Sequence, residues 1–226
     1  MSSEVGNVDL PRRKCVPMFS LKSSLKGSLA YRTNKGSIWG ATVPEKYTRL
    51  VDHIHGRRVL ELGAAEGVLA LLLAKDKEKV FALEMKEDRH QEALRLQAHR
   101  RQQGYDVDRC EMIQGNILDR LDLLPQVDCL VGIRSIYYLR DKVDQLFAAV
   151  SRHVKHVTLC GNRNRARRYF EANGEPGDKL GKYNFYASIE GMTTVLGNNG
   201  YTITRVIADG DPIVVGEKKV DLPSRS

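Results

Sequence analysis

The chain has 226 residues and a mass of 25.5 kDa, which allows one sizeable domain or a domain with an arm. Hydrophobic residues are 42% and charged residues 28%, an ordinary balance that argues against global disorder. No apolar window approaches the ~18 residues of a membrane helix, and no apolar signal segment follows Met1. The four cysteines lack metal-ligand spacing, so we expect a cytoplasmic protein in a reducing compartment rather than a disulfide scaffold or zinc module.

The net charge of +8 is unevenly distributed along the chain. Residues 1–58 hold 11 basic and four acidic residues, a balance of +7, whereas the other 168 residues sum to +1. Such a basic front suits nucleic acid, anionic lipid or an acidic small molecule. A solvated arm without a partner is the simpler alternative.

Residues 1–40 are rich in Ser, Gly, Lys and Arg without periodicity, which predicts a basic N-terminal arm or lid. A capping box at 42–45 then starts a helix, and from residue 58 short apolar runs alternate with longer amphipathic ones. The predicted strands cover 58–62, 80–84, 110–114, 127–133, 155–161, 202–208 and 212–217. The predicted helices cover about 43–55, 66–75, 87–103, 139–150 and 189–196.

Strands that alternate with helices indicate βαβ units and a parallel sheet whose right-handed crossovers place helices on both faces. The last two strands lie close together and predict an antiparallel pair. We therefore expect an α/β fold, a doubly wound Rossmann-like mixed sheet of seven strands, parallel with a terminal antiparallel strand pair. This domain would span 41–220, with a tail over 221–226.

The loop after the first predicted strand is the first place to look for a ligand, because open α/β sheets bind ligands beyond the carboxyl ends of their strands. It reads ELGAAEG over 61–67. Gly63 allows a sharp turn with close backbone approach, and Gly67 allows the next helix to pack closely. The spacing is neither GxGxxG nor a Walker motif, and Glu61 would repel a pyrophosphate but suits a cationic ligand.

This turn resembles motif I of the class I S-adenosylmethionine-dependent methyltransferases, and the resemblance spans residues 55–217. It implies S-adenosyl-L-methionine as cofactor and S-adenosyl-L-homocysteine as product. By this resemblance, Glu61 faces the amino end of the methionine moiety. The backbone around Gly63, Ala64, Ala65 and Gly67 lines the cofactor. A glycine-rich turn without a ligand is the alternative.

The ends of the second and third predicted strands carry further candidates. Glu84 lies 21 positions beyond Gly63, close to the ~20-residue spacing of a ribose-binding acid, and a carboxylate can accept both hydroxyl protons. The resemblance implies that Met85 packs on the adenine and that Ile117 covers its ring face. It also places an acid near the adenine amino group, where this chain has Asn116, whose oxygen can still accept that hydrogen bond without charge.

The fourth predicted strand leads into a stretch that resembles the family's motif IV region. Arg134 is unusual in this place and could meet the cofactor carboxylate or an acidic acceptor. Ser135 and Tyr138 are candidate acceptor-binding residues, and Tyr137 is the candidate catalytic residue. In the alternative interpretation, one tyrosine is a core residue and the other lies at the rim. Because no metal-ligand cluster is visible, we expect no metal and catalysis by positioning.

Four arginines follow Gly161 at the carboxyl end of the fifth predicted strand. Arginine captures phosphate or carboxylate groups with two parallel hydrogen bonds, so this loop suits an anionic acceptor, although a solvated helix face explains it equally well. The Gly- and Pro-rich continuation predicts an insertion or cap over 163–187. The candidate acceptor-binding residues added here are Asn162, Arg163, Arg165 and Trp39, the only tryptophan.

These features predict a methyltransferase that moves a methyl group by direct displacement to a small polar, anionic acceptor such as a sugar, a nucleotide-sugar or a secondary metabolite. An RNA methyltransferase is the first alternative, favoured by the basic front but lacking a visible RNA-binding module or Asn-Pro-Pro-aromatic motif. A non-catalytic methyltransferase-like binding scaffold and, more distantly, a NAD-dependent enzyme complete the alternatives. The sequence does not indicate the methylated atom or the oligomeric state.

Overall fold

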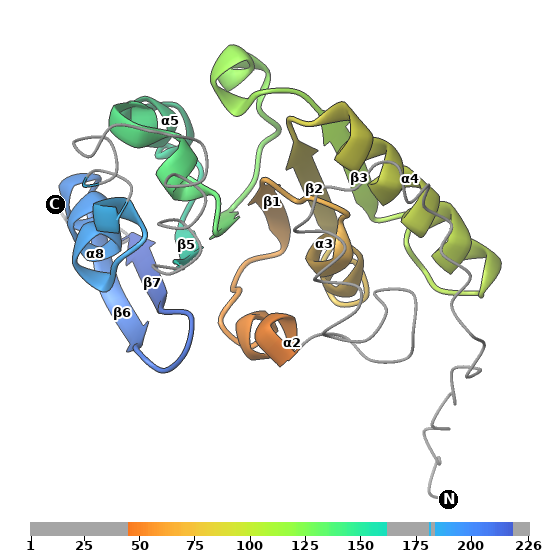
Figure 1. Cartoon of the computed structure of the whole chain (residues 1–226), viewed down its shortest axis with the longest axis horizontal. Helices are drawn as coiled ribbons and strands as arrows, with labels where there is room; N and C mark the ends of the chain where they lie inside the picture. The colour runs from red at the N-terminus through yellow and green to blue at the C-terminus, as the bar shows by residue number, and fades with distance from the viewer. Residues whose placement is uncertain (1–44, 162–180, 182–183, 219–226) are drawn as a thin grey trace, which may run out of the picture. The chain divides into compact units, whose positions relative to one another are not determined.

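A computed structural model describes residues 45–161, 181 and 184–218 of the chain (Figure 1). The chain divides into two units, residues 1–49 and residues 50–226. Of the first unit, only the start of helix α2 (Glu45–Val51) is described. The second unit holds all seven strands of the sheet.

Helices and strands alternate along the second unit, as the sequence pattern predicts. Its strands are β1 (Arg58–Leu62), β2 (Lys79–Glu84), β3 (Cys110–Gln114), β4 (Cys129–Ile133), β5 (His156–Cys160), β6 (Tyr201–Ile207) and β7 (Ile213–Lys218). Its α-helices whose bounds fall within the described residues are α3 (Val68–Leu73), α4 (Glu87–Gln102), α5 (Val143–Val150) and α8 (Ile189–Asn198). Short 3₁₀ turns are η1 (Ile117–Asp119), η2 (Leu121–Leu123), η3 (Ile136–Tyr138) and η4 (Arg140–Lys142).

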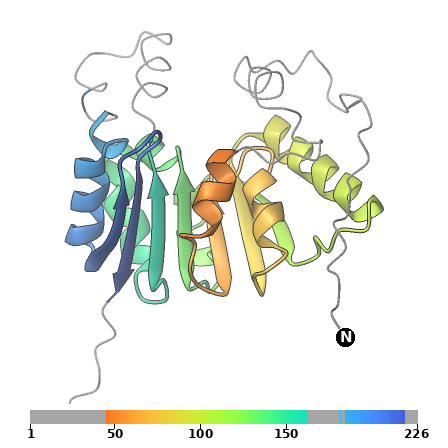
Figure 2. The ribbon, with the colours of Figure 1, turned by 90° about the horizontal axis from the view of Figure 1, so that it is seen from below.

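The strands form one mixed sheet in the order β3-β2-β1-β4-β5-β7-β6. Neighbours from β3 to β5 pair in parallel, whereas β7 runs antiparallel to both β5 and β6. The chain first runs from β1 outward to strand β3, and later from β4 outward to the other side of the sheet, where β6 is the last strand. Helices therefore lie on both faces of the sheet (Figures 1 and 2). This arrangement confirms the predicted fold class, including the antiparallel pair.

The hydrophobic core consists largely of apolar side chains from strands that are covered on both faces of the sheet. Val59 and Leu60 of β1 and Leu130 and Val131 of β4 are fully buried, as expected for central parallel strands. Phe147 of α5 is also fully buried and meets the ring of Tyr201 edge to face, with the ring centroids 5.8 Å apart. A sheet packed on both faces therefore supports the loops that leave the ends of its strands.

Several element boundaries differ from the sequence prediction for identifiable reasons. The helix predicted over 66–75 is shorter because Gly67 is left-handed, with φ 72°, and cannot belong to it. The helix predicted over 139–150 begins only at Val143, after the turns η3 and η4. The strand predicted from residue 127 begins at Cys129, although the Asp128 N–H before it still donates to the Arg58 carbonyl at 3.0 Å, and its carboxylate accepts the Arg58 N–H at 2.9 Å.

Three described cysteines, at positions 110, 129 and 160, are free and buried. Burial raises the pKa of the Cys110 thiol to about 12 and also raises the pKa of the Cys129 thiol. Both thiols therefore stay protonated near neutral pH and are poor nucleophiles. In the described ranges, no helix is both long enough and apolar enough to cross a membrane.

Candidate active site

The predicted site residues gather where the parallel strands end. The carboxyl ends of β1 to β5 lie at one edge of the sheet, because these strands are parallel and in close register. The loops leaving this edge include residues 63–67 after β1, 85–86 after β2, 115–116 after β3 and 134–135 after β4. Open α/β sheets bind ligands at such an edge.

The turn after β1 is built from alternating left-handed residues. Gly63, Ala65 and Gly67 have φ values of 65°, 52° and 72°. Between them, the Ala64 N–H donates to the Leu83 carbonyl of β2 at 3.0 Å, and the Gly67 N–H donates to the Ala64 carbonyl at 2.8 Å. The turn is thus held against the end of β2 by its own backbone.

Both glycines of this turn also allow a close approach that a side chain would prevent. A Cβ atom on Gly63 would lie 2.9 Å from the Cβ of Ser135 in the loop after β4. A Cβ atom on Gly67 would lie 2.7 Å from Cε of Met112 and 3.2 Å from the Cβ of Ala93. The glycine positions singled out in the sequence therefore have two separate packing reasons.

Two carboxylates are buried beside this turn. Glu61, 3% exposed, lies on β1 in register with Ala82 of β2 and Val131 of β4. Glu84, 7% exposed, ends β2 and accepts the Ala65 N–H at 2.8 Å on one oxygen and the Lys86 N–H at 2.8 Å on the other. Each oxygen of an ionised carboxylate has about two lone-pair sites, so Glu84 can accept further hydrogen bonds from a ligand.

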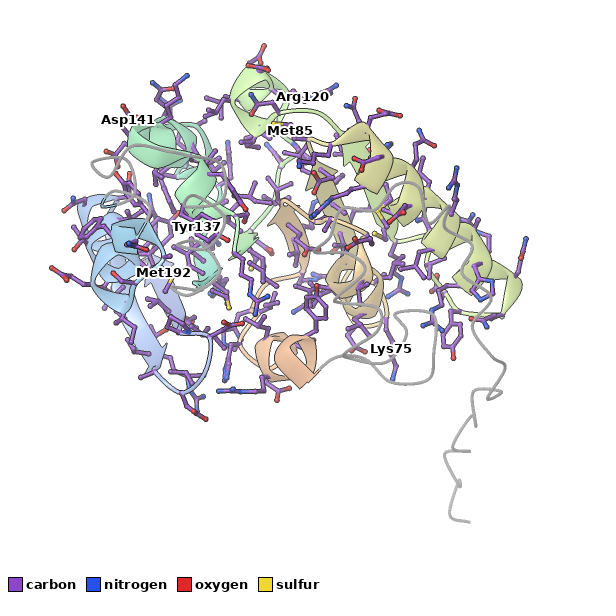
Figure 3. All side chains as sticks on the ribbon, in the orientation of Figure 1. Lys75, Met85, Arg120, Tyr137, Asp141 and Met192 are labelled. Carbon is purple, nitrogen blue, oxygen red and sulfur yellow. The ribbon has the colours of Figure 1, made fainter. Side chains whose placement is uncertain are left out.

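The loops after β2 and β3 place apolar and amide groups at the same edge. Met85 is 58% exposed, the largest value among the exposed large apolar side chains of the described residues, and lies where β2 leads into α4 (Figure 3). The amide oxygen of Asn116 already accepts the Leu118 N–H at 3.2 Å, which leaves one lone pair of that oxygen. Ile117 is 6% exposed and belongs to the core cluster. The side chain of Arg120 fills the space that a Cβ atom on Gly115 would occupy, a contact that sequence reasoning missed.

Arg134 ends β4 in a left-handed conformation, with φ 52°. Its N–H donates to the Cys160 carbonyl of β5 at 2.7 Å. Its guanidinium pairs with the carboxylate of Asp211, from the loop between β6 and β7, and the two side chains are 18% and 24% exposed. The charge that was expected to meet a cofactor or acceptor thus already has a protein partner.

The residues after Arg134 divide between core and rim. The Ser135 hydroxyl is buried, and within the described part of the chain it has no hydrogen-bond partner. Tyr137 is 2% exposed and Tyr138 is 49% exposed, with ring centroids 4.6 Å apart (Figure 3 labels Tyr137). This difference favours the alternative in which one tyrosine is a core residue and the other lies at the rim, and it gives no support to a catalytic Tyr137.

Several predicted residues and segments lie outside the described residues. They are Trp39, Asn162, Arg163 and Arg165, the arm over 1–40, most of the insertion over 163–187 and the tail over 221–226. Among the described residues, sequence reasoning missed Asp211. Its signal was the turn sequence ADGDP between two predicted antiparallel strands, because such a turn comes back to the carboxyl end of β5.

Two other features do not involve this edge. A cavity of about 180 Å³ lies near the amino end of β4, lined by residues that include Asp122, Pro125, Val127 and His153, and it contains none of the candidate site residues. Across residues 45–161, 181 and 184–218, no group of three or more His, Cys, Asp or Glu side chains could hold a metal ion.

Comparison with solved structures places the fold among class I methyltransferases. The methyltransferase domain of bacterial CtHen1-C is 16% identical, with a TM-score of 0.57 over 78% of this chain and 98% of that one. Magnesium protoporphyrin IX methyltransferase from Synechocystis, with bound SAH, is 15% identical, with a TM-score of 0.56 over 86% and 95%. A SAM-dependent methyltransferase from Aquifex aeolicus is 17% identical, with a TM-score of 0.55 over 88% and 98%.

No protein-family model matches the chain, and no curated protein matches its sequence. The likeness is therefore one of fold: the chain has the seven-stranded fold of class I S-adenosylmethionine-dependent methyltransferases.

Proposed function

We propose that this protein is an S-adenosylmethionine-dependent methyltransferase that acts on a small polar, anionic acceptor. The observation that carries the proposal is the turn after β1, joined through Ala65 to the buried carboxylate of Glu84 at the end of β2. This hydrogen-bonded pair lies at the carboxyl ends of the strands, where open α/β sheets bind ligands. It places an accessible backbone turn beside a negatively charged side chain.

The residues present at this edge fit that cofactor. Exposed Met85 offers an apolar surface to a purine, and Glu84 keeps lone pairs for the hydroxyl groups of a ribose. The buried hydroxyl of Ser135, without a partner among the described residues, faces the turn at Gly63. Buried polar groups are normally hydrogen-bonded, so this hydroxyl is consistent with a polar ligand beside it.

In the proposed reaction, S-adenosylmethionine would supply a methyl group that is already activated by its sulfonium. The protein would chiefly hold the acceptor in line, since proximity and orientation alone can lower a barrier by about 7–11 kcal/mol. The buried carboxylates of Glu61 and Glu84 would place negative charge beside the cofactor, which suits a cationic ligand better than a pyrophosphate. Four histidines lie at or near the amino ends of β1 and β5, which is the end of the strands opposite the proposed site: His53, His55, His153 and His156. In this proposal they take no part in removing a proton from the acceptor.

Cofactor binding is the first expected result. S-adenosylhomocysteine at about 100 times its Kd should stabilise the protein by about 2.7 kcal/mol, because it binds only the folded state. Thermal unfolding and titration calorimetry measure this effect, with NAD as the control ligand. Glu84→Ala should weaken binding. An unchanged melting temperature at millimolar S-adenosylhomocysteine would contradict the proposal, and a shift with NAD alone would favour a dehydrogenase.

The anionic acceptor is supported by charge rather than by a described pocket. The basic excess of the first 58 residues and the arginines that follow Gly161 favour a phosphate or carboxylate group on the acceptor. Among the described residues of this edge, Arg134 is already paired with Asp211. The same basic residues would suit an RNA backbone, which makes an RNA methyltransferase the second candidate.

Salt dependence should separate these acceptors. We expect transfer of a labelled methyl group to a small anionic acceptor to fall less than about threefold between ~50 and ~200 mM salt, since few counterions are released. Binding of an RNA acceptor would weaken by about 10³ over the same range of salt, and this binding would require residues 1–35. Transfer to a panel of sugar phosphates, nucleotide-sugars and bulk RNA measures this, and steep salt dependence would overturn the small-molecule proposal.

A further inference from the structure

Ala65 is an unusual residue for the conformation that it adopts. Apart from Arg134, it is the only non-glycine residue with a positive φ in the described part of the chain. Its neighbours in the alternating turn, Gly63 and Gly67, are glycines, which take this conformation without steric conflict. A left-handed alanine is disfavoured by its Cβ, so the surrounding structure must hold it in place.

Among the described residues, the Ala65 N–H has its hydrogen-bond acceptor in Glu84. The N–H donates to one carboxylate oxygen at 2.8 Å, and the other oxygen accepts the Lys86 N–H at 2.8 Å. Hydrogen bonds to an ionised oxygen are stronger than neutral ones, and burial of Glu84 to 7% exposure limits competition from water. One side chain thus joins the turn after β1 to the start of α4.

We infer that Glu84 is a positioning residue that holds the turn at Ala65 in its ligand-ready conformation before any ligand arrives. The inference rests on the proposed function for the identity of that ligand. It assigns Glu84 a role beyond direct contact with a ribose. It also accounts for an alanine in a turn whose other left-handed positions are glycines, because the carboxylate compensates for the strain.

A glutamine at position 84 separates the two roles. Its amide keeps the shape of the side chain and one oxygen that could accept from a ribose hydroxyl, but its NH₂ group would face a backbone N–H donor. Glu84→Gln therefore removes one of the two backbone hydrogen bonds while it preserves a ribose acceptor. Ala65→Gly is the complementary change, because glycine adopts the left-handed conformation without compensation.

Hydrogen exchange of the ligand-free protein is the primary test. In Glu84→Gln, at least one of the two amide hydrogens, that of Ala65 or that of Lys86, should exchange about tenfold faster than in the unaltered protein. This is the change expected when one charge-assisted hydrogen bond is lost. Glu87→Gln is the matched control, since the exposed carboxylate of Glu87 accepts a hydrogen bond from the Gln91 side chain at 2.7 Å and does not hold the turn after β1. Unchanged exchange at both amides in Glu84→Gln would overturn the inference.

Ligand affinity is the second test. Glu84→Gln should weaken S-adenosylhomocysteine and its 2′,3′-dideoxy analogue alike, by about tenfold, and Ala65→Gly in the same chain should restore part of both affinities. An effect confined to S-adenosylhomocysteine would mean that Glu84 is a ribose ligand only, and would overturn the inference. If the unaltered protein binds neither ligand, the proposed function fails, while the exchange experiment still decides the role of Glu84. The Ala65→Gly background also serves if Glu84→Gln alone fails to fold.

Discussion

Gly63→Ala should weaken binding of S-adenosylhomocysteine by about a hundredfold, since a left-handed alanine and an overpacked contact together cost about 3 kcal/mol. The new Cβ would lie 2.9 Å from the Cβ of Ser135, and both atoms are fixed to backbone rather than to flexible side-chain ends. The turn or the loop after β4 must move, and both belong to the proposed cofactor site. Titration calorimetry measures the loss.

Two further variants separate the collision from general strain. Gly200 also has a positive φ, 79°, but a Cβ there meets no atom within 4 Å, so Gly200→Ala should lower stability by about 1 kcal/mol without changing affinity. Ser135→Gly, combined with Gly63→Ala, removes the colliding atom and should restore part of the affinity, and Ser135→Gly alone measures what the loss of the hydroxyl costs. If Gly63→Ala binds S-adenosylhomocysteine as tightly as the unaltered protein, the turn does not line the cofactor.

Asp211→Ala should lower the free energy of unfolding by about 2 kcal/mol, because it leaves the largely buried guanidinium of Arg134 without its partner. The double variant Arg134→Met with Asp211→Leu should be more stable than Asp211→Ala, since it buries no unpaired charge. Urea unfolding of the single and double variants measures the coupling between the two positions.

An exposed ion pair provides the control for this effect. Arg57 and Glu78 are 3.0 Å apart with side chains 81% and 45% exposed, so Glu78→Ala should change stability by less than about 0.5 kcal/mol. Equal losses in Asp211→Ala and Glu78→Ala would show that the Arg134 pair contributes no more than a surface pair. In that case the loop between β6 and β7 is held by its backbone bond from the Gly161 N–H to the Pro212 carbonyl, at 2.9 Å.

Most of the fold could be predicted from the sequence because its central strands are short, apolar and bounded by polar turns. The strands at 58–62 and 110–114 have the predicted bounds, and the antiparallel pair was read from the proximity of two apolar runs. The place of β7 between β5 and β6 was not specified, because a hairpin can join a sheet by either of its strands. Helix starts were less accurate where 3₁₀ turns precede the helix, as before Val143.

The candidate site was predictable where spacing carries the information. The glycine turn and Glu84 were found because a strand, a turn and an acid about 20 residues later form one local pattern. Arg134 was also singled out, but its pairing with Asp211, 77 positions later, depends on where β7 enters the sheet. The split between buried Tyr137 and exposed Tyr138 follows from the 3₁₀ turn, whose geometry the sequence pattern did not reveal.

The position of β7 between β5 and β6 has a consequence for how the chain folds as it is synthesised. Every strand from β1 to β5 can find its neighbours once β5 has left the ribosome, but the outer edge of β5 stays open until residues 213–218 follow. Strand β6 emerges earlier yet has no partner in the sheet other than β7. Strand β7 therefore covers the open edge of β5, which is prone to aggregation, and attaches β6 to the sheet in the same step, so this side of the sheet forms only after residues 213–218 have emerged.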